Sequence, residues 1–296
     1  MPPRIRERSK RWVSGLTACG RSAIVDGVGQ QPTNGADRGE CIVTGASEGI
    51  GAAFARAVAR RGRSLLLVAR RGALLDALAA EIRAAHGVPV RTLAADLGVA
   101  DGIDALVDAA LADGRRPSML INNAGFGLYG DVAACDERRL VEMLRLNVEA
   151  VVVLSRRLAR AMSGVPGAAI LNVASTAAFQ ACPGFGTYAA TKAFVLAFTE
   201  AMHIELEGKI RVTAVCPGYT ESGFHAVAGL DLKTMKLPIM TAEDVAEQAL
   251  RASDAGACVH VSGLGNKVLV AASGIVPRAL SRRVAGKIFR RNSFER

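Results

Sequence analysis

Short apolar segments alternate with longer segments of helical periodicity between residues 40 and 262. The apolar segments have the length of strands and lack a regular polar alternation, as expected of strands buried on both faces. We predict strands at 40–43, 64–69, 88–93, 118–122, 167–173, 209–215 and 257–261. We predict helices between them at 50–61, 72–86, 102–113, 136–162, 188–207 and 241–252. This alternation is typical of α/β proteins in which helices cover both faces of a parallel sheet.

The alternation predicts one doubly wound α/β domain of the Rossmann type over residues 40–262, with a seven-stranded parallel sheet. Residues 1–39 mix arginine, glycine and small residues without a sustained period, which indicates a flexible basic extension. The arginines at its start leave a targeting segment open as an alternative. Residues 263–296 form a second basic extension. No segment of the sequence approaches the roughly 20 consecutive apolar residues of a membrane span.

The net charge of +10 is concentrated in the two extensions. Residues 1–39 carry seven basic and three acidic side chains, and residues 263–296 carry eight basic and one acidic, so the domain between them is nearly neutral. A nucleic-acid-binding domain places basic residues on its folded surface, often interleaved with aromatic ones. Aromatic residues are 4% of the chain, so we predict no nucleic-acid binding.

Six cysteines are scattered along the chain, with no Cys-x-x-Cys pair and no cluster of cysteines and histidines. This pattern predicts no metal site. Scattered single cysteines are typical of reduced thiols, and we therefore expect a cytoplasmic protein.

A turn with three glycines separates the first predicted strand from the first predicted helix, in Thr44-Gly45-Ala46-Ser47-Glu48-Gly49-Ile50-Gly51. A strand, a glycine-rich turn and a helix N-terminus form a phosphate cradle, because unpaired backbone N–H groups and the helix dipole point into the turn. Glycine lets a pyrophosphate approach where a Cβ would collide. The spacing Gly-x-x-x-Gly-x-Gly differs from the usual dinucleotide fingerprint, so a turn that needs glycine only for packing is the alternative.

Two arginines, Arg70 and Arg71, follow the second predicted strand, where a dinucleotide site faces the adenosine ribose. An acidic residue there binds the ribose hydroxyls, whereas two arginines can bind a 2′-phosphate. We therefore predict NADP(H) in preference to NAD(H), with surface charge at a helix start as the alternative. Asp96 and Leu97 close the third strand, where the Asp96 carboxylate can accept a hydrogen bond from adenine or cap the next helix.

Residues suited to proton transfer follow the later strands. Asn122-Asn123-Ala124-Gly125 ends the fourth strand, where small residues allow close approach of a cofactor and the amides can tie strands together, although a plain turn looks similar. Ser175 ends the fifth strand, and thirteen residues later Tyr188 and Lys192 share one face of a helix. An adjacent ammonium favours the phenolate of a tyrosine, whose pKa is ordinarily about 10. Ser175 can then hold a carbonyl while Tyr188 transfers the proton.

The combination of these motifs resembles the short-chain dehydrogenase/reductase family. The motifs occur in the family's order and span about residues 40–262: Thr44-Gly45-x-x-x-Gly49-x-Gly51, Asn122-Asn123-Ala124-Gly125, Asn147, Ser175, Tyr188-x-x-x-Lys192 and Pro217-Gly218. The resemblance implies a catalytic tetrad of Asn147, Ser175, Tyr188 and Lys192, in which Asn147 orders a water that connects to the lysine.

The resemblance also implies how the nicotinamide half of the cofactor is bound. Lys192 is expected to bind the nicotinamide ribose, and Pro217, Gly218 and Thr220 are expected beside the carboxamide. Glu48 departs from the family pattern, because NADP-using relatives often have a basic residue there. This departure leaves the 2′-phosphate to Arg70, Arg71 and Ser47.

Apolar side chains surround the expected reaction centre. The irregular segment from Gly218 to Pro238 offers apolar side chains such as Phe224, Leu230 and Met235, and such segments often cover binding sites. Phe179, Cys182 and Phe185 add apolar surface near Tyr188. We expect an NADP(H)-dependent oxidoreductase that interconverts a ketone or aldehyde and an alcohol, and the resemblance points to 3-oxoacyl, long-chain or steroid-like carbonyl substrates. The alternative is a non-catalytic NADP(H)-sensing or scaffold protein that retains the fold.

The C-terminal extension has an apolar stretch followed by a basic helical pattern. Pro277 suits the first position of a helix, and Val276, Leu280, Val284 and Ile288 recur every four residues among arginines and lysines. This pattern over 267–291 predicts either peripheral contact with an anionic membrane or docking on the domain itself or on a second subunit. The family resemblance also implies a homo-oligomer, either a dimer or a tetramer.

Overall fold

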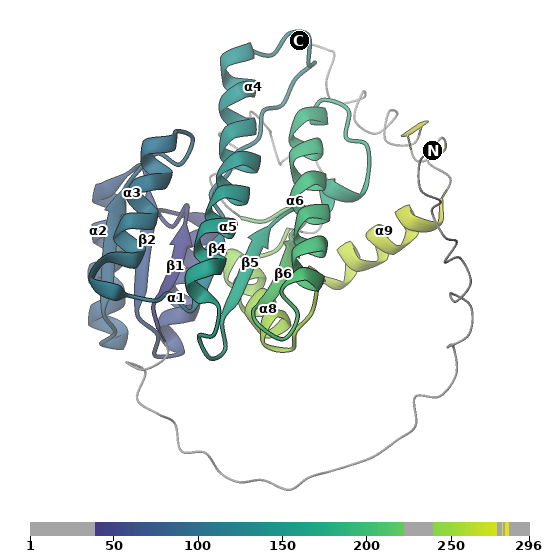
Figure 1. Ribbon diagram of the computed structural model, residues 1–296. Coiled ribbons are helices and arrows are strands. Elements are labelled where there is room, and N and C mark those ends of the chain that lie inside the picture. The colour runs from purple at the N-terminus through teal and green to yellow at the C-terminus, as the bar shows by residue number, and fades with distance from the viewer. Residues whose placement is uncertain (1–38, 222–238, 277–279, 281, 284–296) are drawn as a thin grey trace, which may run out of the picture. The chain divides into compact units, whose positions relative to one another are not determined.

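Seven parallel strands form one sheet in the order β3-β2-β1-β4-β5-β6-β7 (Figure 1). The computed structural model describes residues 39–221, 239–276, 280, 282 and 283, all within one compact unit, Asn34–Arg296. The strands are β1 (Cys41–Thr44), β2 (Leu65–Ala69), β3 (Val90–Ala94), β4 (Met119–Asn122), β5 (Ala169–Val173), β6 (Arg211–Cys216) and β7 (Val259–Val261). The predicted fold class is confirmed, and each predicted strand is present with its ends moved by at most two residues.

Helices connect the strands and cover both faces of the sheet (Figure 1). They are α1 (Gly49–Arg60), α2 (Gly72–His86), α3 (Ala100–Leu111), α4 (Glu137–Leu144), α5 (Ala150–Met162), α6 (Gly186–Glu205), α8 (Ala242–Asp254) and α9 (Leu264–Ile275). None of the helices in the described ranges is long and apolar enough to cross a bilayer.

The observed helices differ from the predicted ones in two places. The helix predicted at 136–162 is divided into α4 and α5 by a π-helical turn, Arg145–Glu149, which contains Asn147. In the C-terminal extension, α9 occupies the stretch before Pro277, where no helix was predicted. Leu280, Arg282 and Arg283, in the helix predicted from Pro277, are helical. Most of the pattern after Pro277, and the apolar segment 222–238, lie outside the described residues.

Both faces of the sheet are buried in hydrophobic cores. Along β1, Cys41 and Val43 enter the core formed with α1, α2 and α8, while Ile42 enters the core formed with α3, α5 and α6. Side chains of successive strand residues point to opposite faces, so both sets must be apolar when helices cover both faces. This requirement explains the uninterrupted apolar segments of the sequence.

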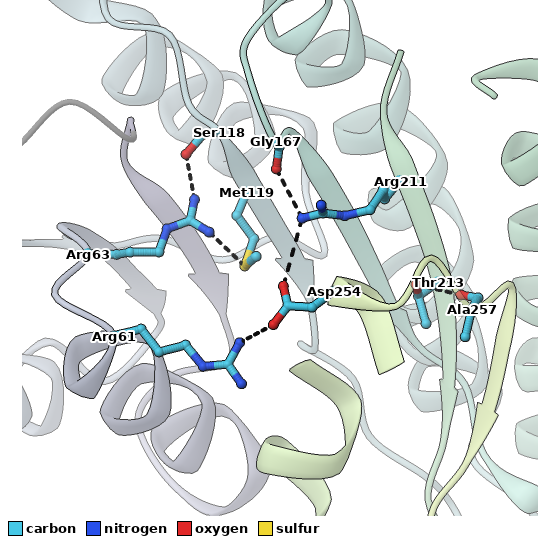
Figure 2. Close-up of polar contacts among 9 residues, drawn as sticks. All are labelled: Arg61, Arg63, Ser118, Met119, Gly167, Arg211, Thr213, Asp254 and Ala257. Atoms are coloured by element: carbon cyan, nitrogen blue, oxygen red, sulfur yellow. Dashed lines mark hydrogen bonds and ion pairs between the residues drawn. The ribbon is translucent and has the colours of Figure 1, made fainter. Parts of the chain in front are cut away.

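Polar contacts at the amino ends of the strands hold the edge of the sheet opposite the cavity described below (Figure 2). Arg61, after α1, donates to the Asp254 carboxylate at 2.8 Å, and Arg211 lies 3.8 Å from the same carboxylate. Arg63 donates to the Ser118 hydroxyl at 2.5 Å. These contacts connect the segments before β2, β4 and β6 to the end of α8, and they leave the carboxyl ends of the strands free for a site.

Candidate active site

A cavity of about 690 Å³ lies at the carboxyl ends of the strands. Its walls come from the segments that follow each strand, as expected for a doubly wound sheet. Every residue that the sequence predicts to bind the cofactor lines this cavity: Gly45, Ser47, Glu48, Gly49, Ile50, Gly51, Arg70, Arg71, Asp96, Leu97, Asn123, Ala124, Gly125, Tyr188, Lys192, Pro217, Gly218 and Thr220. Of the predicted catalytic residues, Ser175, Tyr188 and Lys192 line it as well.

The glycine turn at one end of the cavity needs its glycines for two reasons. Gly45 and Gly49 have φ values of +65° and +56°, in the region that side chains disfavour. Gly51 is required by packing, because a Cβ there would lie 2.2 Å from the Gly45 carbonyl oxygen. No side chain caps the N-terminus of α1. Its first backbone N–H groups therefore face the turn without a side-chain acceptor, which suits an anion.

Arg71 lines the cavity and is held in place by two residues of the glycine turn. Its guanidinium donates to the Ser47 hydroxyl at 2.9 Å and pairs with the Glu48 carboxylate at 2.8 Å. Arg70 is exposed beside it and has no ion pair or hydrogen bond with the other described residues. Glu48, which departs from the family pattern, therefore forms an ion pair with Arg71. Arg71 is one of the two arginines that the sequence assigns to a 2′-phosphate.

Asp96 lines the same end of the cavity and organises its own loop. Its side chain accepts a hydrogen bond from the Gly98 N–H at 2.9 Å. The alternative that Asp96 caps the next helix is wrong. The N-cap residue of α3 is Val99, and no side chain accepts a hydrogen bond from the first turn of this helix. Asp96 thus keeps one carboxylate oxygen for a ligand.

The asparagines after β4 tie neighbouring strands together, as predicted. The buried Asn122 amide donates to Asn172 on β5 at 2.8 Å and to Ser155 on α5 at 3.0 Å. Asn123 donates to the carbonyl oxygens of Thr44 and Gly45 at 2.9 and 3.2 Å. These bonds fix the end of β4 against the glycine turn, so the floor of the cavity is rigid.

Ser175, Tyr188 and Lys192 meet in the middle of the cavity. Ser175 precedes a short 3₁₀ turn, Thr176–Phe179, and its hydroxyl forms a hydrogen bond with Tyr188. Lys192, one turn further along α6, donates to the Val173 carbonyl oxygen at 2.8 Å, and its Nζ lies 5.8 Å from the centroid of the Tyr188 ring. The fold thus brings the Ser175 hydroxyl, which follows β5, together with the buried phenol and ammonium of α6.

Burial controls the protonation of this group. It raises the pKa of Tyr188 well above its usual value, and the hydrogen bond with Ser175 only partly opposes the rise. Burial also lowers the pKa of Lys192 to about 8. Burial, and not the charge of the lysine, thus sets the pKa of Tyr188. The expected stabilisation of a phenolate by Lys192 stays a prediction. Tyr188 is a neutral phenol at neutral pH and has a proton to donate.

Asn147 is buried but does not line the cavity. Its amide donates to the Phe126 carbonyl oxygen at 2.9 Å and to the Thr191 hydroxyl at 3.1 Å, and its Oδ1 accepts from the Phe126 N–H at 3.1 Å. The side chain therefore joins the loop after β4 to α6, next to Lys192. The expected role of Asn147 in ordering a water stays a prediction. Its hydrogen bonds show that it positions the loop at Phe126 and the part of α6 that holds Thr191.

The other end of the cavity is mostly apolar. The expected Phe179, Cys182 and Phe185 line it, and the Phe185 ring packs edge-on against Tyr188 with centroids 5.2 Å apart. The sequence analysis missed the wall supplied by α9: Asn266, Leu269, Val270 and Ser273. These residues follow the i, i+3, i+4, i+7 spacing of one helix face, a signal that a helix assigned from Leu264 would have exposed. In the described part of the chain, no three His, Cys, Asp or Glu side chains gather into a metal site.

Comparison with known proteins identifies this arrangement. The family model described as short chain dehydrogenase matches residues 40–231. The chain belongs to the short-chain dehydrogenase family. As a member it is an oxidoreductase that acts on alcohol and ketone groups.

Two curated relatives and one solved structure illustrate the range of similar members. The chain is 37% identical to the sulfoacetaldehyde reductase of Chromohalobacter salexigens, over 71% of this chain and 86% of that protein. It is 32% identical to the very-long-chain 3-oxoacyl-CoA reductase of Anas platyrhynchos, over 71% of this chain and 65% of that protein. A short-chain dehydrogenase from Sphingobium yanoikuyae, solved in complex with NADPH, has a TM-score of 0.72 and 33% identity and covers 81% of this chain and 97% of its own.

Proposed function

We propose that this short-chain dehydrogenase reduces a lipophilic ketone or aldehyde with NADPH, and that it catalyses the reverse oxidation when the alcohol is in excess. The observation that carries the proposal is the hydrogen-bonded pair of Ser175 and Tyr188 beside Lys192, inside a cavity that joins a phosphate cradle to an apolar end. A non-catalytic sensor or scaffold has no need of a buried phenol held in this arrangement.

The residues of the cradle fit a dinucleotide phosphate group. The turn is closed to side chains at Gly45 and Gly51, where an added Cβ would lie within 2.9 Å of backbone atoms. The open N-terminus of α1 supplies N–H donors for a phosphate. Lys192 lines the same cavity and would bind the nicotinamide ribose, as the family resemblance implies. When bound, the nicotinamide supplies or accepts the hydride.

The protein's part in the reaction is binding and proton transfer. The Ser175 hydroxyl orients the substrate carbonyl oxygen toward Tyr188, and the Tyr188 hydroxyl donates its proton to that oxygen as an alkoxide develops. The Lys192 ammonium stabilises the negative charge that then develops on the phenol oxygen. Asn147 holds the loop at Phe126 and the start of α6 in register, so that these groups stay aligned.

Arg70 and Arg71 support the preference for NADP(H). Both line the adenosine end of the cavity, and no acidic residue follows β2 to bind ribose hydroxyls. A 2′-phosphate would take two or more charge-assisted hydrogen bonds from these guanidinium groups. Glu48 is the opposing feature, since its carboxylate pairs with Arg71.

The walls of the cavity favour a lipophilic substrate over a small charged one. Among the described lining residues, the only cations are Arg70, Arg71 and Lys192, which lie at the adenosine end and at the reaction centre. A sulfonate or carboxylate on the substrate would therefore lack a charged partner at the apolar end, and its desolvation would oppose binding. An alkyl chain there contacts Phe179, Phe185 and the α9 wall, and each buried methylene contributes about 0.8 kcal/mol.

A chain-length series tests the proposal. NADPH oxidation is followed with purified protein and a series of methyl ketones or 3-oxoacyl esters of increasing length, with sulfoacetaldehyde as the polar comparison. We expect kcat/KM to rise by up to about 4-fold per methylene until the cavity is filled. A preference for sulfoacetaldehyde would overturn the lipophilic assignment. No turnover with any carbonyl compound, together with intact NADPH binding, would favour the sensor or scaffold alternative.

Three further predictions rest on the sequence and the family. They are a homo-oligomeric state, a cytoplasmic location with or without membrane contact through 267–291, and a division into extensions at 1–39 and 263–296 around a catalytic domain of 40–262. The α9 wall argues against a sharp boundary at 262, because Asn266, Leu269, Val270 and Ser273 of the proposed extension line the cavity. Sedimentation velocity of the full chain tests the oligomeric state.

A further inference from the structure

The two faces of α9 differ in what they contact. One face, Asn266, Leu269, Val270 and Ser273, lines the cavity. The opposite face begins with Leu264 and Val268, which are 79% and 63% exposed, and continues with the exposed Ala271 and Ala272. Figure 1 shows α9 (yellow) extending outward past α6 and α8. One helix is thus both a wall of the cavity and an apolar outer surface.

An uncovered outer face of this composition is unusual for a surface helix. Surface helices normally turn charged or polar residues outward, whereas helices that are apolar on all sides are buried. Apart from Lys267, α9 carries no charged residue. Leu264, Val268 and Ala271 recur at the i, i+4, i+7 spacing of a single stripe, which indicates a surface that binds an apolar partner.

The net charge of the segment that contains α9 favours one kind of partner. Residues 263–296 carry eight basic residues and a single acidic one, and the described Arg282 and Arg283 are exposed. A second copy of the chain docked through the same face would bring two such basic segments together, and like charges oppose that contact. An anionic lipid surface offers hydrocarbon for the apolar stripe and negative charge for the arginines and lysines.

We propose that the outer face of α9 docks on an anionic lipid surface and thereby places the α9 wall of the cavity beside the bilayer. The docking does not depend on the proposed reaction. Its consequence, that a lipophilic carbonyl compound enters the cavity from the membrane instead of from water, does rest on the proposed function. The docking element is α9 itself, a helix that the sequence pattern did not predict and that ends before Pro277.

Vesicle co-sedimentation with a charge-matched control tests the docking. The full-length chain is mixed at low salt with vesicles of phosphatidylcholine alone or with phosphatidylglycerol. The test variant is Leu264→Glu/Val268→Glu. The control is Ile204→Glu/Val132→Glu, which makes the same charge change at side chains of similar exposure, 69% and 66%, outside α9. We expect the wild type and the control to bind anionic vesicles, and the test variant to bind about 10-fold or more weakly.

Other outcomes would overturn the docking. The proposal is wrong if the wild type stays in the supernatant with anionic vesicles, or if the control loses binding as much as the test variant. It is also wrong if the test variant changes the sedimentation coefficient of the free protein, because the face would then bind a second copy. Reduction of a short, water-soluble ketone is measured in parallel. Wild-type activity in the test variant shows a folded cavity and separates a failure of docking from a failure of the proposed function.

Discussion

The ion pair between Glu48 and Arg71 offers a direct test of how this chain selects its cofactor. Glu48→Gln keeps the size of the side chain and removes the carboxylate that lies 2.8 Å from the Arg71 guanidinium. In the wild type, a 2′-phosphate must displace this carboxylate or share the guanidinium with it. We therefore expect Glu48→Gln to strengthen NADPH binding and to leave NADH binding almost unchanged.

The size of the effect follows from the exposure of the pair. Both side chains are about half exposed, at 52% and 48%, and ion pairs between such groups contribute roughly 0.2–1 kcal/mol. Release of Arg71 should thus lower the Kd for NADPH by about 1.4- to 5-fold. Arg71→Ala removes the phosphate contact itself, and a hydrogen bond to a charged group contributes about 1.5–3 kcal/mol, so NADPH should bind roughly 10- to 150-fold more weakly.

Fluorescence titration of both cofactors into the wild type, Glu48→Gln, Arg71→Ala and the double variant measures these changes. In the double variant the gain from Glu48→Gln should disappear, because its partner is absent. High salt should reduce the gain, since the pair is exposed. The reasoning is refuted if Glu48→Gln weakens NADPH binding, or if Arg71→Ala weakens NADH and NADPH equally.

Three further predictions concern the reaction centre and the stability of the fold. Tyr188→Phe should abolish carbonyl reduction and leave NADPH binding within about a few-fold, since it removes only the proton donor; steady-state turnover near wild type would contradict this. The kcat/KM for reduction should fall as the pH rises above about 8, because Lys192 then loses its charge. Tyr188 keeps its proton in this range, since burial raises its pKa. A flat pH profile of kcat/KM through this range would contradict the role of the lysine. Asn122→Ala should lower the free energy of unfolding, measured in urea, by about 1–3 kcal/mol, because it leaves the buried Asn172 side chain without its hydrogen-bond donor. Asp254→Asn, which weakens an exposed ion pair, should lower it by less than about 1 kcal/mol. Equal losses in the two variants would contradict the distinction.

The sequence by itself determined the architecture and the position of the site. Strands buried on both faces of a sheet must be apolar throughout, so their number and approximate ends are visible as apolar segments. The carboxyl ends of parallel strands meet at one edge, and this rule places Gly45, Arg71, Asn123 and Ser175 around one cavity without any knowledge of distances. Helix periodicity likewise puts Tyr188 and Lys192 on one face, because their spacing is local.

Only the tertiary structure decided how these groups behave. The pKa of Tyr188 depends on its burial by segments far away in the chain, and the local pattern suggested only the charge of the nearby lysine. The pairing of Glu48 with Arg71 joins residues of two different strand ends, which no periodicity reports. Both faces of α9 carry large apolar residues, Leu269 and Val270 on one and Leu264 and Val268 on the other, so the sequence could not tell which face lines the cavity. Periodicity reports which residues share a face of an element; what that face meets is set by long-range packing.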